Sequence, residues 1–270
     1  KIYLKFLMKK KLPLVSIIMN CHNGEKYLIN SLNSIFAQDY HNWELIFWDN
    51  KSHDNSKKII KKYQDKRVRY FYSNRLLPLY HARNKAINKT KGNFICFLDT
   101  DDYWNKKFLS KFIAKFNKEN SDVVFSKYYI FNQKTKKKKI NEKKNFFKSI
   151  STQQLLDKYI VGISAVMLKK DIFKKYKFNN KFQIIGDFDL FIKLSHFHKF
   201  CMINEPLLTY RLHKDNFSKK NLKLYVNEYN YWLKLNKLTF IKNYEINRLN
   251  FFILKLKLKI ILKILFFLKI

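Results

Sequence analysis

The sequence predicts an α/β fold built on a central, mixed but mostly parallel sheet with helices on both faces. Four short apolar segments suited to buried strands lie within residues 14–98, and a helical pattern of apolar residues follows each of them. Polar residues come directly after three of these segments. Because ligands of open α/β sheets bind at the carboxyl ends of the strands, the three polar clusters predict one binding site at that edge.

The overall composition indicates a globular protein with a strongly basic surface. The 270 residues carry a formal net charge of +36, and 47% of them are hydrophobic, so the chain can bury a sizeable core. The charge is compatible with nucleic-acid binding, but the excess is mainly Lys distributed over every segment. Such a surface is attracted to anionic membranes at low salt. The three cysteines indicate buried thiols in a reducing compartment.

The first two predicted strands end in polar residues. The segment 14–19 runs into the sequence Asn-Cys-His-Asn-Gly at 20–24, and the segment 43–48 runs into Asp-Asn-Lys-Ser-His-Asp at 49–54. Apolar residues at helical spacing follow both clusters. The first polar loop has one glycine and neither the G-x-G-x-x-G nor the P-loop pattern, which argues against a flavin, NAD or P-loop NTPase site.

The fourth apolar segment leads into a dense group of carboxylates. A strand at 68–72 and a helix at 82–88 precede the strand 94–98, which runs into Asp99, Asp101 and Asp102. Three like charges at a strand end repel one another unless a cation lies between them. Mg²⁺ and Mn²⁺ suit this place, because they prefer carboxylate oxygen and commonly bridge to substrate phosphate. The alternative is helix capping, for which Asp is a favoured residue.

After residue 102, the predicted strands and helices alternate less regularly. Their apolar patterns predict a helix at 108–116, a strand at 123–131, an exposed lysine-rich loop at 134–144, a helix near 155, a strand at 163–168 and a helix at 171–176. A loop then turns into a helix over 186–194, where Asp187 and Asp189 either serve a site or complement the helix dipole. A strand at 206–213 ends in Arg211-Leu212-His213.

The last twenty residues, 251–270, are apolar apart from five lysines. Lys255, Lys259 and Lys263 share one helical face, while Lys257 departs from it. We favour a basic amphipathic helix that lies in a membrane interface; packing on the rest of the chain or on another subunit is the alternative. No run of about 18 uncharged apolar residues occurs, so a transmembrane helix is not expected.

Several segments, in the same order along the chain, resemble family 2 glycosyltransferases. Residues 15–28 (VSIIMNCHNGEKYL) are similar to the opening of that family, and the further similar segments are 34–40, 43–49, 52–56, 82–84, 92–95, 97–104, 186–190 and 210–213. The ordered set covers residues 13–218 and is far more specific than a lone D-x-D. It implies a single Rossmann-like GT-A domain at 13–218, with a C-terminal helical extension at 219–270, and inverting transfer from a nucleotide-diphospho-sugar.

The resemblance also implies roles for the carboxylates. Asp99 and Asp101 would form the D-x-D element, in which Asp101 holds Mn²⁺ or Mg²⁺ on the diphosphate and Asp99 contacts the ribose or the metal. His213 is placed like a histidine that completes the metal coordination in some relatives, and Arg211 could steady phosphate. An ordinary polar strand end is the alternative for both. Asp102 is expected to cap the following helix.

The expected general base is Asp187, which matches the aspartate of the family's E-D motif and would take the proton from the acceptor hydroxyl. Gly186 replaces the usual acidic neighbour, which leaves Asp189 as an alternative base. We favour Asp187 because it occupies the corner between loop and helix, whereas Asp189 lies within the helix turn.

The nucleotide side departs further from the family pattern. The expected donor contacts are Asn20, His22, Asn23, Asp49, Asn50 and Arg83, together with Asp99 and Arg211. Relatives often have paired aspartates after the second strand, whereas this chain has Asp49-Asn50. A UDP-sugar is the expected donor, although Asn50 offers both a donor and an acceptor to a base.

The sequence therefore predicts an inverting, metal-assisted glycosyltransferase that acts on a glycan or lipid-linked acceptor in cell-surface polysaccharide biosynthesis. Its expected place is the cytoplasm, peripheral to the inner face of the cytoplasmic membrane. One alternative is a non-catalytic sugar-nucleotide-binding protein, for which Gly186 and Asn50 are the hints. The other is a basic nucleic-acid-binding protein, which leaves the three polar clusters without an explanation.

Overall fold

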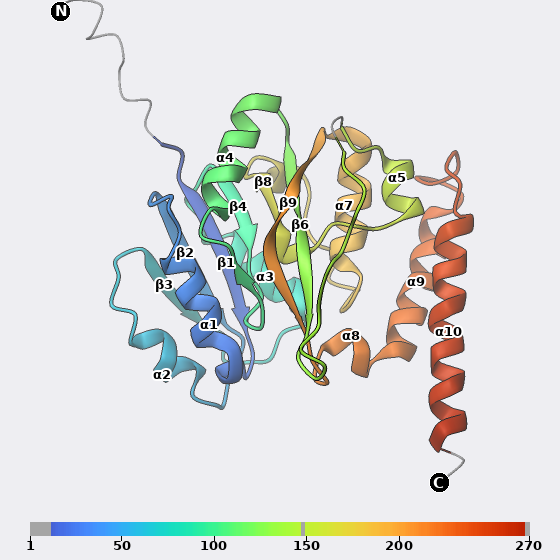
Figure 1. Cartoon of the computed structure of the whole chain (residues 1–270), viewed down its shortest axis with the longest axis horizontal. Helices are drawn as coiled ribbons and strands as arrows, with labels where there is room; N and C mark the ends of the chain where they lie inside the picture. The colour runs from blue at the N-terminus through green and yellow to red at the C-terminus, as the bar shows by residue number, and fades with distance from the viewer. Residues whose placement is uncertain (1–11, 147–148, 268–270) are drawn as a thin grey trace, which may run out of the picture.

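The computed structural model describes residues 12–146 and 149–267 and confirms the predicted α/β architecture. One sheet has the strand order β3-β2-β1-β4-β8-β6-β9-β5, and β7 pairs with β6. The sheet curves, and helices lie on both of its sides (Figure 1). The expectations for residues 1–11, 147–148 and 268–270 lie outside the described residues.

The N-terminal half of the sheet is parallel, as predicted. Its strands are β1 (Val15–Cys21), β2 (Trp43–Asp49), β3 (Val68–Tyr72) and β4 (Phe94–Phe97). β1 lies between β2 and β4, and all four strands run in the same direction. The carboxyl ends of β2, β1 and β4 therefore lie side by side at one edge of the sheet, here called the site edge.

Two buried clusters pack against the two faces of the sheet. The helices that precede β9 and contribute to these clusters are α1 (Glu25–Phe36), α2 (Ser56–Lys61), α3 (Leu79–Ile87), α4 (Phe108–Glu119), α5 (Thr152–Asp157), α6 (Ile172–Lys175) and α7 (Gly186–Phe197). α1 and α4 share one cluster with Ile17 and Met19 of β1, whereas α3, α5 and α7 share the other with Ile18. Burial on both faces explains why β1, β2 and β4 are mostly apolar, without the strict alternation of a half-exposed strand.

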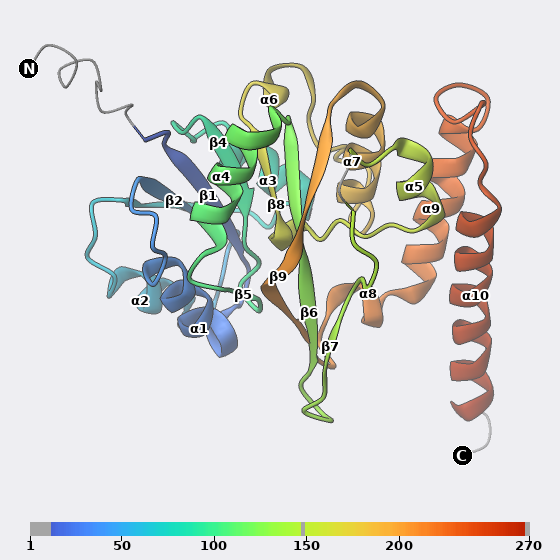
Figure 2. The same cartoon turned by 45° about the horizontal axis from the view of Figure 1, so that its top comes forward.

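The second half of the sheet is mixed; it contains one short strand, at residues 103–104, that was not predicted, and it differs from the prediction in three further places. Its strands are β5 (Tyr103–Trp104), β6 (Val123–Asn132), β7 (Lys138–Ile140), β8 (Val166–Lys169) and β9 (Phe200–Leu212). The predicted loop at 134–144 is wrong in part, because β7 pairs with β6 as a hairpin (Figure 2). Lysines on an exposed edge strand conceal the strand pattern while discouraging edge-to-edge pairing.

The other two differences also have local causes. The predicted strand 163–168 begins with a 3₁₀ turn, Ile163–Ala165, before β8. β9 starts at Phe200 rather than at Pro206, and its pairing with β6 is interrupted where Lys127 pairs with Pro206. Asn204, Glu205 and Pro206 are residue types common in turns, but here one long strand continues through them, and Asn204, Glu205 and Leu207 bulge out of the register with β6.

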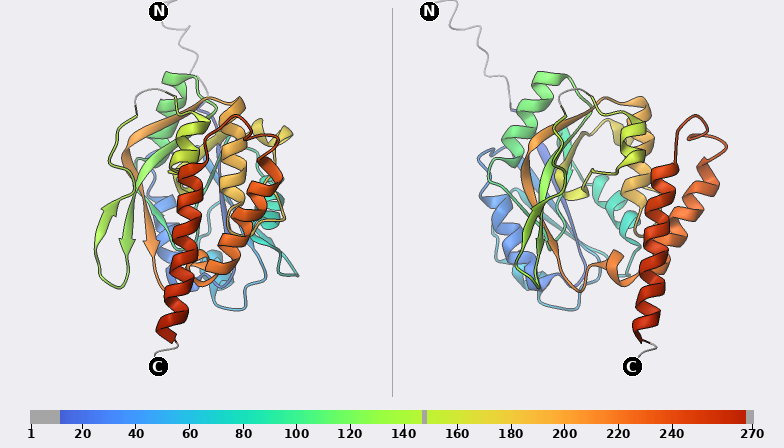
Figure 3. Two further views of the ribbon diagram at one scale, coloured as in Figure 1. Left: turned by 90° about the vertical axis from the view of Figure 1, so that its right-hand side faces the viewer. Right: turned by 45° about the vertical axis from the view of Figure 1, so that its right-hand side comes forward.

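The C-terminal helices cover the α3–α7 side of the sheet. They are α8 (Phe217–Lys220), α9 (Leu222–Asn236) and α10 (Asn247–Phe267). Trp232 of α9 and Ile253 of α10 belong to the same buried cluster as Phe188 of α7. α10 runs alongside α9 and packs on α9 and α5 (Figure 3). In the described part of the chain, no helix combines the length and apolar character that crossing a bilayer requires.

Candidate active site

The site edge brings the polar clusters after β1 and β2 into direct contact. The Asn50 backbone N–H donates to the Cys21 carbonyl oxygen at 2.7 Å, and Nδ1 of His22 lies 3.0 Å from the Asn50 carbonyl oxygen. Asn23 has a left-handed backbone with φ of 53°, and its Oδ1 accepts from the His53 N–H at 2.8 Å. These bonds connect the two loops into one wall of the site.

The side chains of Asp49 and Asn50 are engaged within the chain. Asp49 accepts from the Tyr70 hydroxyl at 2.7 Å and from the Ser52 N–H at 2.8 Å. The Asn50 amide donates to the Leu77 carbonyl oxygen at 2.8 Å and accepts from the Leu77 N–H at 3.1 Å. Asn50 thus fixes the segment that leads into α3.

Asn20, at the end of β1, differs from these neighbours. Both polar atoms of its side chain are buried, and neither has a hydrogen-bond partner among the described residues. A buried amide without partners costs free energy, so Asn20 retains hydrogen-bonding capacity that a ligand at the site edge could use.

The D-x-D carboxylates after β4 point to different partners. Oδ1 of Asp99 lies 2.7 Å from the guanidinium of Arg83, whose side chain is 3% exposed. Oδ2 of Asp101 lies 2.9 Å from Nε2 of His213. Burial raises the pKa of Asp99, and the attraction of Arg83 opposes that rise.

Asp102 does not cap the following helix, contrary to the expectation. α4 begins at Phe108, and Asp102 instead accepts from the Arg211 N–H of β9 at 3.0 Å. Burial, together with the charges of Asp101 and Asp99, raises the pKa of Asp102 well above its ordinary value. Asp102 therefore joins the D-x-D loop to β9.

Arg211 strengthens the same connection. Its Nε donates to the Asp101 carbonyl oxygen at 2.9 Å, and one terminal nitrogen donates to Asn30 of α1 at 2.9 Å. Its guanidinium also lies over the Tyr27 ring, 4.6 Å from the centroid. Arg211 thus holds the D-x-D loop against α1.

The predicted metal ligands are only partly brought together. No group of three or more His, Cys, Asp or Glu side chains within residues 12–146 and 149–267 is arranged to hold a metal ion. Asp101 and His213 lie together, whereas Asp99 faces Arg83. Mg²⁺ is commonly bound through one or two carboxylates plus substrate phosphates, so Asp101 suits such an ion, and His213 lies beside it.

Asp187 lies in the first turn of α7 and is surrounded by hydroxyl groups. The Tyr80 hydroxyl lies 3.0 Å from Oδ1 of Asp187 and 2.9 Å from the Ile184 carbonyl oxygen, and its one proton can be donated to either. The Tyr159 hydroxyl lies 3.4 Å from Oδ2. Burial raises the pKa of Asp187, and Arg83 and the Tyr80 hydroxyl oppose that rise.

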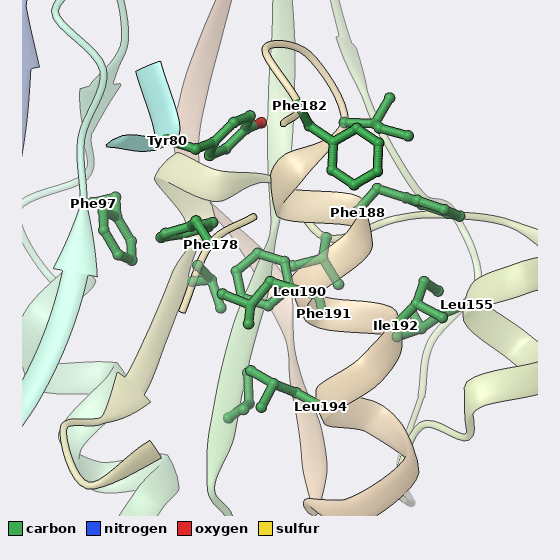
Figure 4. Packing of buried hydrophobic residues seen from close by; sticks show 14 of the residues in the cluster. Tyr80, Phe97, Leu155, Phe178, Phe182, Phe188, Leu190, Phe191, Ile192 and Leu194 are labelled. Atoms are coloured by element: carbon green, nitrogen blue, oxygen red, sulfur yellow. The ribbon is translucent and has the colours of Figure 1, made fainter. Parts of the chain in front are cut away.

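Gly186 is explained by the same tyrosine. A Cβ atom at Gly186 would lie 2.5 Å from two atoms of the Tyr80 ring, closer than any packed side chain allows. Tyr80 is 2% exposed and packs on Phe178, so its ring has little room to move (Figure 4). A side chain at 186, acidic or otherwise, is incompatible with this position of Tyr80.

Asp189 is held by other groups. It is 2% exposed, accepts from the Trp232 indole N–H at 2.9 Å and lies 2.7 Å from the Lys193 ammonium. Glu228, also on α9, accepts from the N–H groups of Ile184 and Ile185 at 2.9 and 3.1 Å, just before α7. α9 therefore positions the loop that carries Asp187.

Sequence reasoning missed Tyr80, Tyr159 and Glu228. No motif marks these residues, and each reaches the Asp187 loop from a distant segment. The one available signal was Gly186 itself, because a missing side chain indicates close approach by another group.

Comparison with known proteins identifies the family. Residues 16–177 match the family described as "Glycosyl transferase family 2". The chain is 34% identical to the uncharacterized glycosyltransferase MJ1057 of Methanocaldococcus jannaschii, over 96% of this chain and 92% of that protein. It is 29% identical to the UDP-Glc:alpha-D-GlcNAc-diphosphoundecaprenol beta-1,3-glucosyltransferase WfgD of Escherichia coli, over 78% and 81% of the two chains.

A solved structure agrees with this result. S. aureus TarS 1–349, in complex with UDP-GlcNAc, superposes with a TM-score of 0.64 at 18% identity, over 81% of this chain and 66% of the TarS chain. This likeness confirms the GT-A fold. The chain is therefore a glycosyltransferase and belongs to family 2.

Proposed function

We propose that this enzyme transfers a sugar from a nucleotide-diphospho-sugar to a glycan or lipid-linked acceptor, with inversion at the anomeric carbon, in the synthesis of a cell-surface polysaccharide. The observation that carries the proposal is the pair Tyr80 and Arg83, three positions apart on α3. Tyr80 contacts Asp187 and Arg83 contacts Asp99. One face of one helix thus joins the proposed base to the proposed donor side.

The donor is proposed to bind along the site edge. Asn20 would supply its unpaired amide groups. His22, Asn23, Asp49 and Asn50 would form the adjoining wall, and Asp99 would contact the ribose or the metal. Arg83 and Arg211 add positive charge close to the diphosphate. A UDP-sugar is the expected donor; WfgD is named for UDP-Glc, and the TarS structure holds UDP-GlcNAc.

Asp101 and His213 would hold Mg²⁺ or Mn²⁺ against the diphosphate. Such an ion, when bound, neutralises charge that develops on the departing nucleoside diphosphate. The protein groups then have a simpler task, because they need only orient the donor and remove one proton from the acceptor.

Asp187 is proposed to remove that proton. Direct displacement requires one carboxylate to accept the hydroxyl proton of the acceptor as its oxygen attacks the anomeric carbon from the side opposite the leaving group. Asp189 is a poorer candidate, because Trp232 and Lys193 already engage it. The hydroxyl groups of Tyr80 and Tyr159 hold Asp187 without forming an ion pair.

The proposed place of action is the inner face of the cytoplasmic membrane, where the enzyme would be peripheral. Supporting this, WfgD is named for an acceptor carried on diphosphoundecaprenol, which is a membrane lipid. The long C-terminal helix exposes apolar side chains.

A donor panel tests the proposed function. The full chain is incubated with Mn²⁺, a set of UDP-, GDP- and TDP-sugars and a polyprenyl-diphosphate-linked sugar, and nucleoside diphosphate release and the product's anomeric configuration are measured. We expect one UDP-sugar to be used, with an inverted product. A retained configuration would contradict the proposal, and binding without transfer across the panel would favour a non-catalytic sugar-nucleotide-binding protein.

A further inference from the structure

Helix α9 turns one face toward the loop that carries Asp187. The residues of this face have the spacing i, i+3, i+4 and i+7, and they are Tyr225, Glu228, Tyr229 and Trp232. The Tyr229 ring lies 5.1 Å, between centroids, from the ring of Phe188, which follows Asp187 in the chain. The Tyr225 ring lies 5.3 Å from that of Tyr229. The start of α9 therefore brings Tyr225 close to the proposed base.

Two more tyrosines reach the same place from other segments. The Tyr159 hydroxyl lies 3.4 Å from Oδ2 of Asp187, and its ring packs edge-on against Phe188 with centroids 5.1 Å apart. Gly162 lets the segment after Tyr159 lie against Tyr128 of β6, because a Cβ atom there would be 3.1 Å from the Tyr128 ring. The three partly exposed tyrosines are here called the tyrosine rim: Tyr128, Tyr159 and Tyr225.

The charge of Asp187 reaches all three members of the tyrosine rim. Burial raises the pKa of Tyr128 and that of Tyr225 to about 12, and the negative charge of Asp187 contributes to both rises. The same two causes raise the pKa of Tyr159 well above its ordinary value. At neutral pH the rim therefore presents uncharged hydroxyl groups around the proposed base.

The cations closest to the Asp187 loop already have partners. Arg83 lies 2.7 Å from Oδ1 of Asp99, and the Lys193 ammonium lies 2.7 Å from Asp189. A carboxylate or phosphate on the reacting sugar of the acceptor would be repelled by Asp187 and would lose its hydration without gaining one of these cations. An uncharged acceptor sugar does not meet this penalty.

An uncharged sugar ring suits the tyrosine rim in shape and chemistry. One face of a pyranose ring carries C–H groups, which pack on an aromatic face, and its hydroxyl groups hydrogen-bond to polar groups around the edge. Tyrosine supplies both kinds of contact, because its ring is apolar and its hydroxyl is a donor and an acceptor. Sites for small neutral ligands commonly combine aromatic walls with a few polar groups in this way.

We propose that the tyrosine rim binds the acceptor as an uncharged pyranose, with one hydroxyl against Asp187 and the ring face against Tyr225. In the transfer, that hydroxyl gives its proton to Asp187 while its oxygen bonds to the anomeric carbon. The bond from this carbon to the diphosphate oxygen breaks, and its electron pair leaves with the nucleoside diphosphate. The assignment rests on the proposed function, because it takes Asp187 as the base.

Binding of matched sugars to the full chain tests the charge of the acceptor. Saturation-transfer NMR in the presence of UDP measures the Kd of the methyl glycosides of glucose, galactose, mannose and N-acetylglucosamine, and of the methyl glycosides of glucuronate and galacturonate. Each uronide differs from its neutral partner by a carboxylate at C6. We expect at least one neutral glycoside to bind, and both uronides to bind at least about tenfold more weakly than that glycoside. A uronide that binds as tightly, or no binding by any neutral glycoside, would overturn the proposal.

The variant Y225L tests the stacking residue. Leucine keeps an apolar side chain but removes the aromatic face, so the Kd of the neutral glycoside should rise about two- to tenfold while the affinity for UDP stays unchanged. Y225F keeps the ring and should retain most of the binding. The matched control is Y129L, which removes a partly exposed tyrosine from the opposite face of β6 and should change neither affinity. Equal losses in Y225L and Y129L, or a loss in Y225F as large as in Y225L, would remove Tyr225 from this role.

Transfer assays separate failure of this proposal from failure of the proposed function. With a neutral acceptor, Y225L should raise the KM for the acceptor and leave kcat close to that of the unaltered chain. Transfer that proceeds with the acceptor KM unchanged in Y225L would contradict the tyrosine rim and leave the proposed function intact. Neutral glycosides that bind in a Tyr225-dependent way, without consumption of any nucleotide-sugar, would contradict the proposed function and leave the rim as a sugar site.

Discussion

The proposed catalytic carboxylates on the donor side and the one on the acceptor side have different partners. On the donor side, Asp99 faces a guanidinium at 2.7 Å and Asp101 faces an imidazole at 2.9 Å. On the acceptor side, Asp187 is bonded by the hydroxyl of Tyr80 and approached by that of Tyr159. Asp99, Asp101 and Asp187 are all partly exposed, yet the groups that face them differ.

The difference in partners matches the two chemical tasks that are proposed for these carboxylates. A carboxylate in an ion pair with a buried guanidinium keeps its charge, because protonation would leave the cation unpaired. Burial raises the pKa of Asp99 as well as that of Asp187, and the charge of Arg83 opposes both rises, but a carboxylate held by neutral hydroxyls can gain and lose a proton without breaking an ion pair. The donor side therefore suits a fixed charge, and the acceptor side suits proton transfer.

The largest effect is expected from removing the proposed base. Asp187→Asn keeps the shape of the side chain but cannot accept the proton, so kcat should fall about 10²–10⁴-fold, the usual contribution of general base catalysis. Donor affinity, measured by titration calorimetry, should stay unchanged. Turnover that survives the substitution would remove Asp187 from its assigned role.

A smaller effect, on donor affinity rather than on kcat, is expected from a substitution on the donor side. Asp101→Asn removes a charged ligand for the ion and the diphosphate, so donor affinity in Mn²⁺ should fall about 10–100-fold, as for loss of a hydrogen bond to a charged group. Asp171→Asn is the control, because the partner of that aspartate among the described residues is an exposed lysine. Unchanged donor affinity in D101N would show that the Asp101–His213 pair does not hold the donor.

The smallest effect concerns the packing of Gly186 against Tyr80. Gly186→Ala should lower the free energy of unfolding by about 1–3 kcal/mol, the usual range for overpacking, because the new methyl group overlaps the Tyr80 ring. Urea denaturation measures this loss. Gly162→Ala, where the methyl would lie 3.1 Å from the Tyr128 ring, should cost less.

The double variant G186A/Y80A tests whether the Tyr80 ring is the reason that position 186 is a glycine. Removing the Tyr80 ring removes the overlap, so the double variant should be more stable than the sum of the single changes predicts. Additive losses would mean that Gly186 is not there to make room for Tyr80.

Much of the fold and part of the candidate site could be predicted from local sequence. Each of β1, β2 and β4 is a mostly apolar segment followed by polar residues, so strand identity, direction and the shared edge follow from short segments. The D-x-D residues follow a strand and Asp187 lies at the start of a helix, so both positions could be located from local sequence. The order of these motifs along the chain indicated the family.

The remaining features depend on contacts between distant segments. Asp189 is engaged by Trp232, and the Asp187 loop is held by Glu228, both from α9. Local patterns carry no information about such pairs. The bulge in β9 was missed because Asn204 to Pro206 have turn chemistry, and only the register with β6 shows that the strand continues through them.

The pH dependence of kcat/KM in the unaltered enzyme and in Tyr80→Phe tests the central claim most directly. The base acts when deprotonated, so activity should fall as the pH decreases through the pKa of Asp187, which burial raises above the ordinary Asp value. The Tyr80 hydroxyl opposes that rise, so its loss in Y80F should move the acidic limb to higher pH. An acidic limb at the ordinary Asp value, or one that Y80F leaves in place, would contradict the assignment of Asp187 as the base.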